Sequence, residues 1–355
     1  MTKPKVLISG ASVAGPALAH VLHRDGYDVT VVERAPTIRD SGYAVDFRGA
    51  AFDVLAELGI AERIREADTA MRGTTLVNAD GTAAGRLPAA AFAGDLEVPK
   101  SALTRILHEI TCADVRYVFG DTMTALRDHG DGVTVEFEHG GTADFDLVFG
   151  ADGVHSTVRR LAFDPQPNPL RHLGMSGAGF TTTNHLGLDH QGLLRPGDGS
   201  AVYLFSAGDP GRLTVSLSFA TASPELDRRD RAEQERAVRA AFAGQGWEIP
   251  RLLTAMSEAD DFYFASSCQV RLDRWSRGRI ALVGDAGYCA APTSGMGTSQ
   301  ALVGASTLAR ALRTAGDHET AFAAYESELR PYVEDNQAKG YEAAAMFGGA
   351  TQPTP

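Results

Sequence analysis

The sequence predicts an α/β protein in which a Rossmann-type dinucleotide-binding domain is interleaved with a second domain built on a mostly antiparallel β-sheet. Long C-terminal helices complete the chain. Three observations predict this fold. Residues 5–34 run from strand to glycine turn to helix to strand, and residues 165–275 change to a succession of alternating strands. A buried strand returns at residues 279–284, and two long helical stretches follow it. A chain of 355 residues is long enough to form two domains.

The first unit reads KVLISGASVAGPALAHVLHRDGYDVTVVER. Its apolar run at residues 6–9 is typical of a buried parallel strand, and the pattern predicts a helix over residues 14–24. Gly26 ends that helix, and residues 28–33 form the next strand. The unit is therefore the βαβ start of a parallel sheet.

The loop between the first strand and the helix resembles the GxGxxG dinucleotide fingerprint, with Ser12 at the second glycine position. Gly10 would make the tight turn, and Gly15 would let the helix pack on the strand. Glu33 closes the second strand about 20 residues later, where a carboxylate binds ribose hydroxyls. The other interpretation is an ordinary βαβ unit with a glycine turn and no ligand.

The middle of the chain predicts further elements in order. Residues 49–59 have helical periodicity, and residues 72–98 read as short strands with turns. A helix follows over residues 101–111, and residues 115–153 read as a β-meander joined by glycine turns. A further helix is expected near residues 229–243.

These elements divide the chain into two interleaved domains and a tail. The predicted boundaries are residues 1–71, 99–164 and 276–330 for a discontinuous cofactor-binding domain, 72–98 and 165–275 for a substrate-binding domain, 317–347 for a C-terminal helix, and 348–355 for a disordered tail.

Composition excludes several classes of function. The net charge of -12 argues against nucleic acid and against an anionic membrane surface as partners. The three cysteines are far apart without a CxxC pair, so neither a disulfide framework nor a metal site is expected. We expect a cytoplasmic protein, either a monomer or a weak homodimer.

Two more motifs repeat the strand–turn–helix order. FGADGVHSTVR at residues 149–159 places Asp152 at the end of a strand. RIALVGDAGYCAAPTSGMG at residues 279–297 places Asp285 in the same way and ends in a glycine-rich turn. The carboxyl ends of parallel strands line the crevice where cofactors bind, and a helix N-terminus there attracts anions.

The three motifs, in this order and spacing, resemble those of the single-component FAD-dependent aromatic hydroxylases, which have the p-hydroxybenzoate hydroxylase fold. The stretch VDFRG at residues 45–49 and the overall length look most like the branch of tetracycline-inactivating flavin monooxygenases. The resemblance extends to about residue 345.

This resemblance implies an FAD-dependent monooxygenase with non-covalent FAD, in which NADPH or NADH reduces the flavin and O2 then forms a flavin C4a-hydroperoxide. One oxygen atom would be inserted into an aromatic or polyketide-like small molecule, as in antibiotic or secondary metabolism. The flavin would carry the chemistry, so no catalytic residue is predicted.

The resemblance also implies which residues hold the cofactors. The FAD pyrophosphate would be wrapped by Gly10, Ser12, Val13, Ala14 and Gly15. Glu33 would bind the adenosine ribose, Arg34 would lie beside the adenine, Lys100 and Asp152 would contact FAD, and Asp285 would bind the ribityl chain. The flavin ring would be approached by Asp46, Pro292, Gly295, Met296 and Gly297.

Two arginines have open roles. Arg48 is either a surface charge or a flavin contact, and Arg39 is either a surface charge or the group that binds the phosphate of NADPH. Asp152 has a second predicted role, as the cap of the helix that follows it.

Aromatic residues on the expected antiparallel strands are the candidates for the substrate pocket, which would lie between that sheet and the flavin. They are Phe180, Tyr203, Phe205 and Phe219. Because side chains alternate along a strand, about half of such aromatics should face elsewhere.

The sequence departs from the family pattern at several positions. Ser12 replaces a glycine, and Lys100 replaces a two-pronged arginine with a point charge. Tyr288 stands where histidine is frequent, and Ser299 and Gly304 stand where asparagine and aspartate are common.

Two alternatives use the same fold or the same cofactor. One is a flavin-dependent reductase or halogenase, although Trp247 lacks the second tryptophan of the halogenase motif because Gln245 occupies that position. The other is a non-catalytic FAD-containing protein that binds a ligand.

Overall fold

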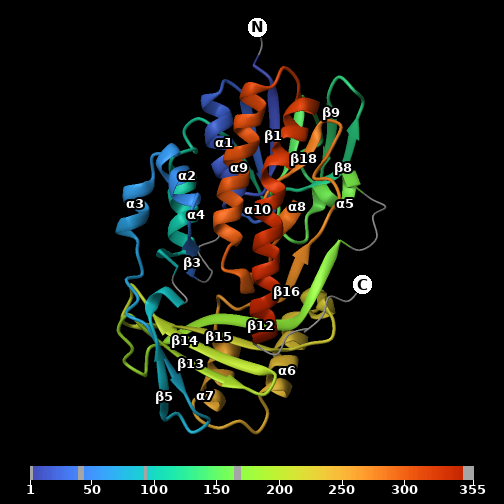
Figure 1. Cartoon of the computed structure of the whole chain (residues 1–355). Coiled ribbons are helices and arrows are strands. Elements are labelled where there is room, and N and C mark those ends of the chain that lie inside the picture. Colours follow the sequence, from blue (N-terminus) through green and yellow to red (C-terminus); the bar gives the residue numbers. More distant parts are fainter. Residues whose placement is uncertain (1–2, 39–43, 92–93, 164–168, 347–355) are drawn as a thin grey trace.

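The computed structural model describes residues 3–38, 44–91, 94–163 and 169–346. It has two lobes, shown in Figure 1. The upper lobe contains a six-stranded sheet and the lower lobe a seven-stranded sheet. The long helix α10 (His318–Met346) runs along the upper lobe and reaches the lower sheet.

The upper sheet has the strand order β17-β18-β11-β1-β2-β7, and all neighbours are parallel except β17 and β18. Its strands are β1 (Lys5–Ser9), β2 (Asp28–Glu33), β7 (Arg116–Phe119), β11 (Leu147–Gly150), β17 (Ser276–Arg277) and β18 (Ile280–Leu282). Val6, Leu7 and Ile8 are fully buried, because helices and a second sheet cover both faces. The carboxyl ends of the parallel strands meet at one edge.

Helices of the upper lobe come from several separate parts of the chain. They are α1 (Ala14–Arg24), α2 (Ala51–Glu57), α3 (Ala61–Glu66), α4 (Lys100–Glu109), α5 (Thr157–Phe163), α8 (Asp285–Tyr288) and α9 (Gly297–Thr314). Helix α1 packs against α9 and α9 against α10, which buries apolar side chains such as Leu18, Leu302 and Leu308. The expected helices over residues 14–24, 49–59 and 101–111 are confirmed as α1, α2 and α4.

The β-meander expected over residues 115–153 is wrong at both ends. Only β8 (Met123–Asp128), β9 (Val133–Phe137) and β10 (Thr142–Phe145) form an antiparallel three-stranded sheet. Strands β7 and β11 instead join the parallel sheet beside β2 and β1. The run LVFG of β11 is fully buried, and such a strand needs cover on both faces.

The lower sheet has the order β16-β12-β15-β14-β13-β4-β5 and is antiparallel except for the β13–β4 pair, so the mostly antiparallel sheet is confirmed. Its strands are β4 (Thr74–Val77), β5 (Ala83–Leu87), β12 (Leu170–Thr183), β13 (Gln191–Gly197), β14 (Ser200–Ser206), β15 (Arg212–Ala220) and β16 (Tyr263–Val270). Helices α6 (Arg231–Ala241) and α7 (Ile249–Glu258) cover one face, where Val238, Leu252 and Met256 are buried. Figure 1 shows both helices below the sheet.

A two-stranded ribbon of β3 (Ala44–Phe47) and β6 (Leu96–Pro99) lies toward the junction of the lobes. Short 3-10 turns are η1 (Ala89–Ala91), η2 (Pro224–Arg228) and η3 (Pro292–Ser294). Across the described ranges, no helix combines the length and the apolar character that a bilayer crossing requires.

Candidate functional site

The three strand–turn–helix motifs pack against one another at the carboxyl edge of the parallel sheet. A Cβ atom on Gly10 would lie 2.4 Å from the carbonyl oxygen of Ala151, in the second motif. A Cβ atom on Gly284, in the third motif, would lie 3.2 Å from the Cβ of Ala14. A side chain at position 10 would overlap the Ala151 backbone, and Gly284 has a φ of +65°, so both positions where the motifs meet favour glycine.

The loop after β1 explains why serine is tolerated within the fingerprint. Gly10 has a φ of +106°, and a Cβ atom on Gly15 would lie 1.9 Å from the carbonyl oxygen of Gly10. Ser12, by contrast, is exposed at the tip of the loop. No described side chain caps the N-terminus of α1 at Val13, so its first peptide N–H groups can bind an anion such as a pyrophosphate.

Glu33 ties this loop to the end of β2. Its Oε2 accepts a hydrogen bond from the Ala11 N–H at 2.9 Å, and its Oε1 accepts one from the Ala35 N–H at 2.9 Å. A carboxylate oxygen can accept a second bond, so Glu33 is also able to bind ribose hydroxyls. Arg34 follows it as an exposed side chain.

The second motif supports the third. Asp152 accepts hydrogen bonds from the N–H groups of Thr157 and Val158 at 2.8 and 3.1 Å, so its predicted capping role on α5 is confirmed. Burial raises the pKa of Asp152. The buried Arg159 donates to the carbonyl of Ala286, at 2.7 Å, and so joins α5 to α8.

Asp285 and Lys100 share one environment. Asp285 begins α8, and Lys100 begins α4. Burial raises the pKa of Asp285, and the positive charge of Lys100 opposes that shift. The structure therefore brings together two predicted FAD contacts that lie far apart in sequence.

The third motif continues into a glycine turn at the N-terminus of α9. Gly295 is left-handed with a φ of +62°, Met296 is buried, and α9 begins at Gly297 without a side-chain cap from the described residues. A Cβ atom on Gly295 would lie 3.4 Å from Oδ2 of Asp46, so β3 borders this turn. Pro292 is exposed beside it.

Ser299 fastens β3 to this helix end. Its Oγ accepts the Arg48 N–H at 3.1 Å and donates to the Asp46 carbonyl at 3.4 Å. The Arg48 guanidinium pairs with the Asp46 carboxylate at 3.3 Å. Arg48 is thus held beside a predicted flavin contact, and Arg39 lies outside the described residues.

Sequence reasoning missed Glu97. It lies directly opposite Asp46 in the β3–β6 ribbon, is 8% exposed, and accepts a hydrogen bond from Thr69 Oγ1 at 2.7 Å. Burial, together with the charge of Asp46, raises the pKa of Glu97 to about 7. Burial raises the pKa of Asp46 to about 6, against the opposing effect of Arg48. The feature of the sequence that could have indicated Glu97 is that it is a single acidic residue inside the otherwise apolar strand LEVP.

Two of the four predicted substrate aromatics lie on the face of the lower sheet that α6 and α7 cover. Phe180 and Phe219 are 2% and 4% exposed and belong to the core beneath that face. The ring of Phe219 packs edge-on against Phe242, with centroids 6.4 Å apart. We therefore do not retain either phenylalanine as a substrate contact.

Tyr203 and Phe205 lie on the opposite face of the same sheet. They alternate along β14 with Val202 and Leu204, whose side chains belong to the core under α6 and α7. The rings of Tyr203 and Phe205 stack at 5.2 Å. Burial raises the pKa of Tyr203 to about 12, the carboxylates of Glu97 and Asp46 contribute, and a hydrogen bond with Thr74 opposes the shift. This pair therefore lies on the side of the two carboxylates.

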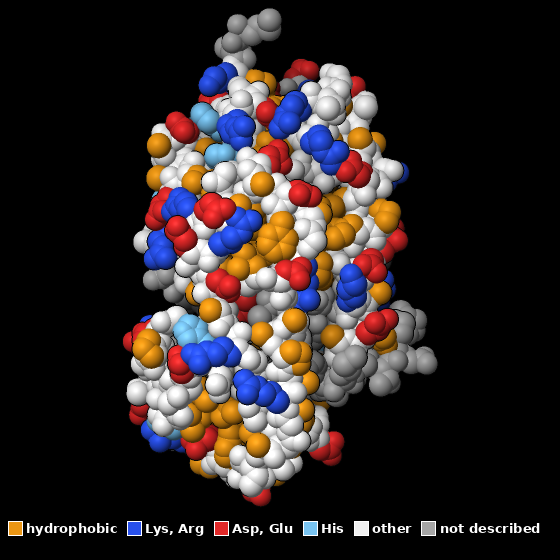
Figure 2. Space-filling view, turned by 60° about the vertical axis from the view of Figure 1, so that its left-hand side comes forward, with side chains coloured by type: hydrophobic (Ala, Val, Ile, Leu, Met, Phe, Trp, Pro, Cys, Tyr) orange, Lys and Arg blue, Asp and Glu red, His pale blue; other side chains and the backbone are white. Residues whose placement is uncertain are grey.

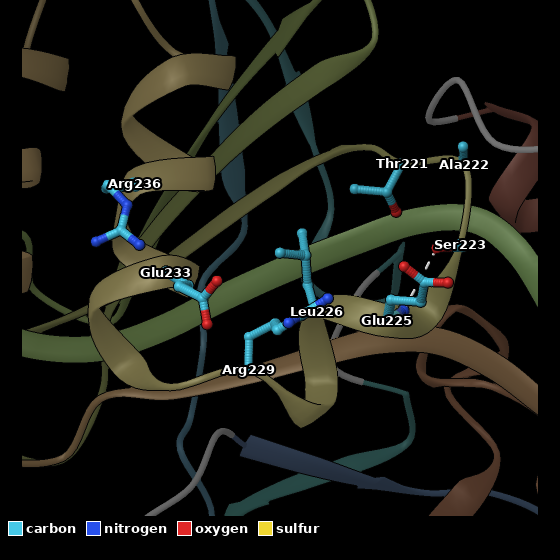
Figure 3. Close-up of a pocket in the computed structure, with 8 residues that line it drawn as sticks. All are labelled: Thr221, Ala222, Ser223, Glu225, Leu226, Arg229, Glu233 and Arg236. Carbon is cyan, nitrogen blue, oxygen red and sulfur yellow. Dashed lines mark hydrogen bonds between the residues drawn. The ribbon is translucent and has the colours of Figure 1, made fainter.

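Other surface features do not coincide with these residues. A groove of about 440 Å³ is lined by residues of η2, α6 and the preceding loop, including Glu233 and Arg236 (Figure 3). It contains none of the predicted site residues, and its charges are of both signs. Figure 2 shows that the surface is hollowed where the lobes meet and that acidic and basic side chains are intermixed on this face.

The site combines three glycine-dependent turns with the N-termini of α1 and α9, which no described side chain caps, and with the carboxylates of Glu33 and Asp285. This combination fits a dinucleotide cofactor that carries a second ring system besides its adenine. Such a fold and site define an FAD-binding flavoprotein. Three comparisons with known proteins agree with this class.

A family model described as FAD binding domain matches residues 3–339. An uncharacterized protein of Mycobacterium tuberculosis is 42% identical over 339 residues, covering 94% of this chain and 91% of that protein. A flavin-dependent monooxygenase from an unknown prokaryotic organism is 39% identical over 347 residues, covering 97% and 90% of the two chains. The crystal structure of tetracycline destructase Tet(55) superposes with a TM-score of 0.90 at 39% identity, covering 99% of this chain and 92% of that one.

The chain belongs to the FAD-binding domain family of flavoprotein hydroxylases, and it is an FAD-dependent monooxygenase. The expectation drawn from the three sequence motifs is confirmed.

Proposed function

We propose that this enzyme uses NADPH or NADH to reduce non-covalently bound FAD and that it hydroxylates an aromatic or polyketide-like small molecule. The observation that supports the substrate class is the stacked pair Tyr203 and Phe205 on the sheet face directed toward Asp46 and Glu97. Flat aromatic surfaces beside hydrogen-bonding groups suit a planar substrate with polar substituents.

FAD, when bound, supplies the redox chemistry that activates O2, and the protein residues bind, orient and shield the reactants. The loop of Gly10 and Gly15 would hold the pyrophosphate, Glu33 the ribose, and Asp285 with Lys100 the ribityl chain. The turn at Gly295 would meet the ring.

The uncapped N-terminus of α9 would favour negative charge on the ring edge that it faces. Asp46 and Glu97 would border the ring on the substrate side. Burial raises the pKa of Glu97 to about 7, and the protonated form of this carboxyl group can donate a hydrogen bond.

Arg39 would provide the positive charge that a nicotinamide dinucleotide needs to dock on a protein whose net charge is -12. Arg39 follows the βαβ unit in the sequence, so the proposal assigns this docking to the flavin lobe.

A substrate screen tests the proposal. Tet(55) is named a tetracycline destructase, so tetracycline-type polyketides and simple phenols are the first compounds to test. We expect one class to stimulate NADPH consumption and to gain one oxygen atom, measured by product mass with and without O2.

The same screen separates the alternatives. NADPH consumption without an oxygenated product would indicate a reductase, and a product that requires halide would indicate a halogenase. Ligand binding without NADPH consumption would indicate a non-catalytic binding protein.

A further inference from the structure

The peptide carbonyls of residues 288–290, which lead into the turn at residues 291–297, accept hydrogen bonds from three side-chain amides. Gln300 donates to the first carbonyl at 2.7 Å, Gln337 to the second at 3.3 Å, and Gln269 to the third at 3.3 Å. We call these three glutamines the amide clamp. They come from α9, α10 and β16, so three separate elements fix one short segment.

The amide clamp is buried and internally connected. Gln269, Gln300 and Gln337 are 1%, 0% and 5% exposed. Gln337 also donates to the Val270 carbonyl at 2.8 Å, its own peptide carbonyl accepts from Gln269 at 2.5 Å, and Asn336 donates to the Gln300 side-chain oxygen at 3.0 Å. Buried amides of this kind have few alternative partners, so they set one geometry.

Helix α10 contacts the turn at two more points. Thr293 Oγ1 donates to the Gly340 carbonyl at 2.7 Å. A Cβ atom on Gly340 would lie 2.1 Å from the Ala290 carbonyl oxygen, so the helix backbone lies directly against the segment. Ala291 lies between residues 290 and 293, which make these two contacts, and it has a φ of +75°. This conformation is unfavourable for alanine and persists only where the surrounding structure holds it.

We propose that the amide clamp positions the turn at residues 291–297 against the flavin and that Gln337 is a positioning residue for the cofactor. The inference rests on the proposed placement of this turn and the N-terminus of α9 at the flavin ring. Without Gln337, the peptide N–H groups at that N-terminus lose their fixed position. The reduced, negatively charged flavin then loses more stabilisation than the oxidised flavin does.

The test compares Gln337→Met with Phe322→Leu. Methionine keeps the length and helix preference of glutamine but has no donor. Phe322 is a buried residue of the same helix, and its ring packs against Phe149 of β11, with centroids 6.1 Å apart. The measurements are thermal stability, the Kd of FAD for the apoprotein, and the midpoint potential of the flavin at saturating FAD.

For Gln337→Met we expect about a tenfold weaker affinity for FAD. We also expect the preference of the protein for reduced over oxidised flavin to be about tenfold smaller. For a two-electron couple, this second change lowers the midpoint potential by about 30 mV. For Phe322→Leu we expect lower thermal stability with both flavin properties unchanged. Equal Kd and potential in the two variants would overturn the inference.

A second variant keeps the test decisive if Gln337→Met does not fold. Thr293→Val keeps the side-chain shape and removes the bond to Gly340, and we expect a smaller shift of the potential in the same direction. An unchanged potential in Thr293→Val would then overturn the inference. Failure of the wild-type apoprotein to bind FAD would contradict the proposed function instead.

Discussion

The hydroxyl of Tyr288 occupies the space in which a side chain of residue 304 would lie. A Cβ atom on Gly304 would be 2.0 Å from Tyr288 Oη. The hydroxyl is held there by a 2.7 Å hydrogen bond with Tyr325, which in turn donates to the Leu282 carbonyl at 2.9 Å. Two departures from the family pattern are thus one coupled change, because tyrosine at position 288 requires glycine at position 304.

This coupling predicts that Gly304→Ala destabilises the protein and that Tyr288→Phe relieves the effect. Overpacking a buried site costs about 1–3 kcal/mol, which exceeds the gain of about 1 kcal/mol from alanine in a helix. Without the hydroxyl, the nearest ring atom would be Cζ, at 3.1 Å. Urea unfolding of the wild type, both single variants and the double variant measures the coupling, and additive free energies would contradict it.

The buried carboxyl of Glu97 makes stability depend on pH. Its pKa is raised from 4.5 to about 7 by burial and by Asp46, against the bond from Thr69. The native state therefore binds this proton more tightly than the unfolded state does. The associated stability is fully present below pH 4.5 and is lost as the pH rises through about 7. We expect Glu97→Gln to remove this loss, which is at most about 3 kcal/mol at pH 8.

The measurement is the free energy of unfolding at several values between pH 4.5 and pH 8, which spans the titration of Glu97. Glu138→Gln, at an exposed position, is the matched control and should keep the slope of the wild type. A Glu97→Gln variant whose stability falls with rising pH as steeply as that of the wild type would show that Glu97 is not the titrating group.

The carboxylates of Glu33 and Asp285 should each contribute to FAD affinity. Glu33→Ala and Asp285→Ala each remove a charge-assisted hydrogen bond of roughly 1.5–3 kcal/mol, so we expect about a ten- to a hundredfold higher Kd. Lys100→Arg should be neutral or should tighten binding, because it restores the family residue. Fluorescence titration of the apoproteins measures all three, and a Glu33→Ala variant with wild-type affinity would remove Glu33 from the site.

Local patterns were sufficient for the elements around the cofactor. Helix α1 spans Ala14–Arg24, as the sequence predicts, because its turn, periodicity and end are encoded by neighbouring residues. The glycine requirement at Gly15 was equally predictable, since it comes from a close approach to the Gly10 carbonyl within one loop, whereas the close approach of Gly10 to Ala151 depends on tertiary packing.

Long-range pairing was not accessible in the same way. Glu97 becomes part of the site only because β6 pairs with β3 in a register that sets it opposite Asp46. The faces of Phe219 and Phe205 depend on which side of the sheet α6 and α7 cover. Strand alternation predicts that two faces exist but not which one borders the cofactor.

Arg39→Ala should raise the KM for NADPH and leave FAD content and product identity unchanged. The positive charge of an arginine would attract the phosphate groups of NADPH, and salt would screen that attraction. Steady-state kinetics at low and high salt measure the effect, which should shrink as salt rises. Identical NADPH kinetics for variant and wild type at low salt, with FAD fully bound, would leave Arg39 as a solvated charge.

The two faces of the lower sheet predict opposite outcomes for matched aromatic substitutions. Phe205→Leu removes one ring of the stacked pair that faces Asp46 and Glu97, whereas Phe219→Leu removes a ring from the core under α6. An aromatic contact contributes about 0.5–1.5 kcal/mol beyond its buried area, so we expect Phe205→Leu to lower kcat/KM for the aromatic substrate about two- to tenfold. Its KM for NADPH should not change.

Phe219→Leu should instead lower the free energy of unfolding by up to about 1.5 kcal/mol and leave kcat/KM unchanged. Both variants are assayed well below their unfolding temperatures, so that lost stability cannot imitate lost catalysis. The ratio of their kcat/KM values is the deciding quantity, because both substitutions remove the same atoms from the same sheet. A ratio near one would show that the substrate does not lie against the face that carries Tyr203 and Phe205.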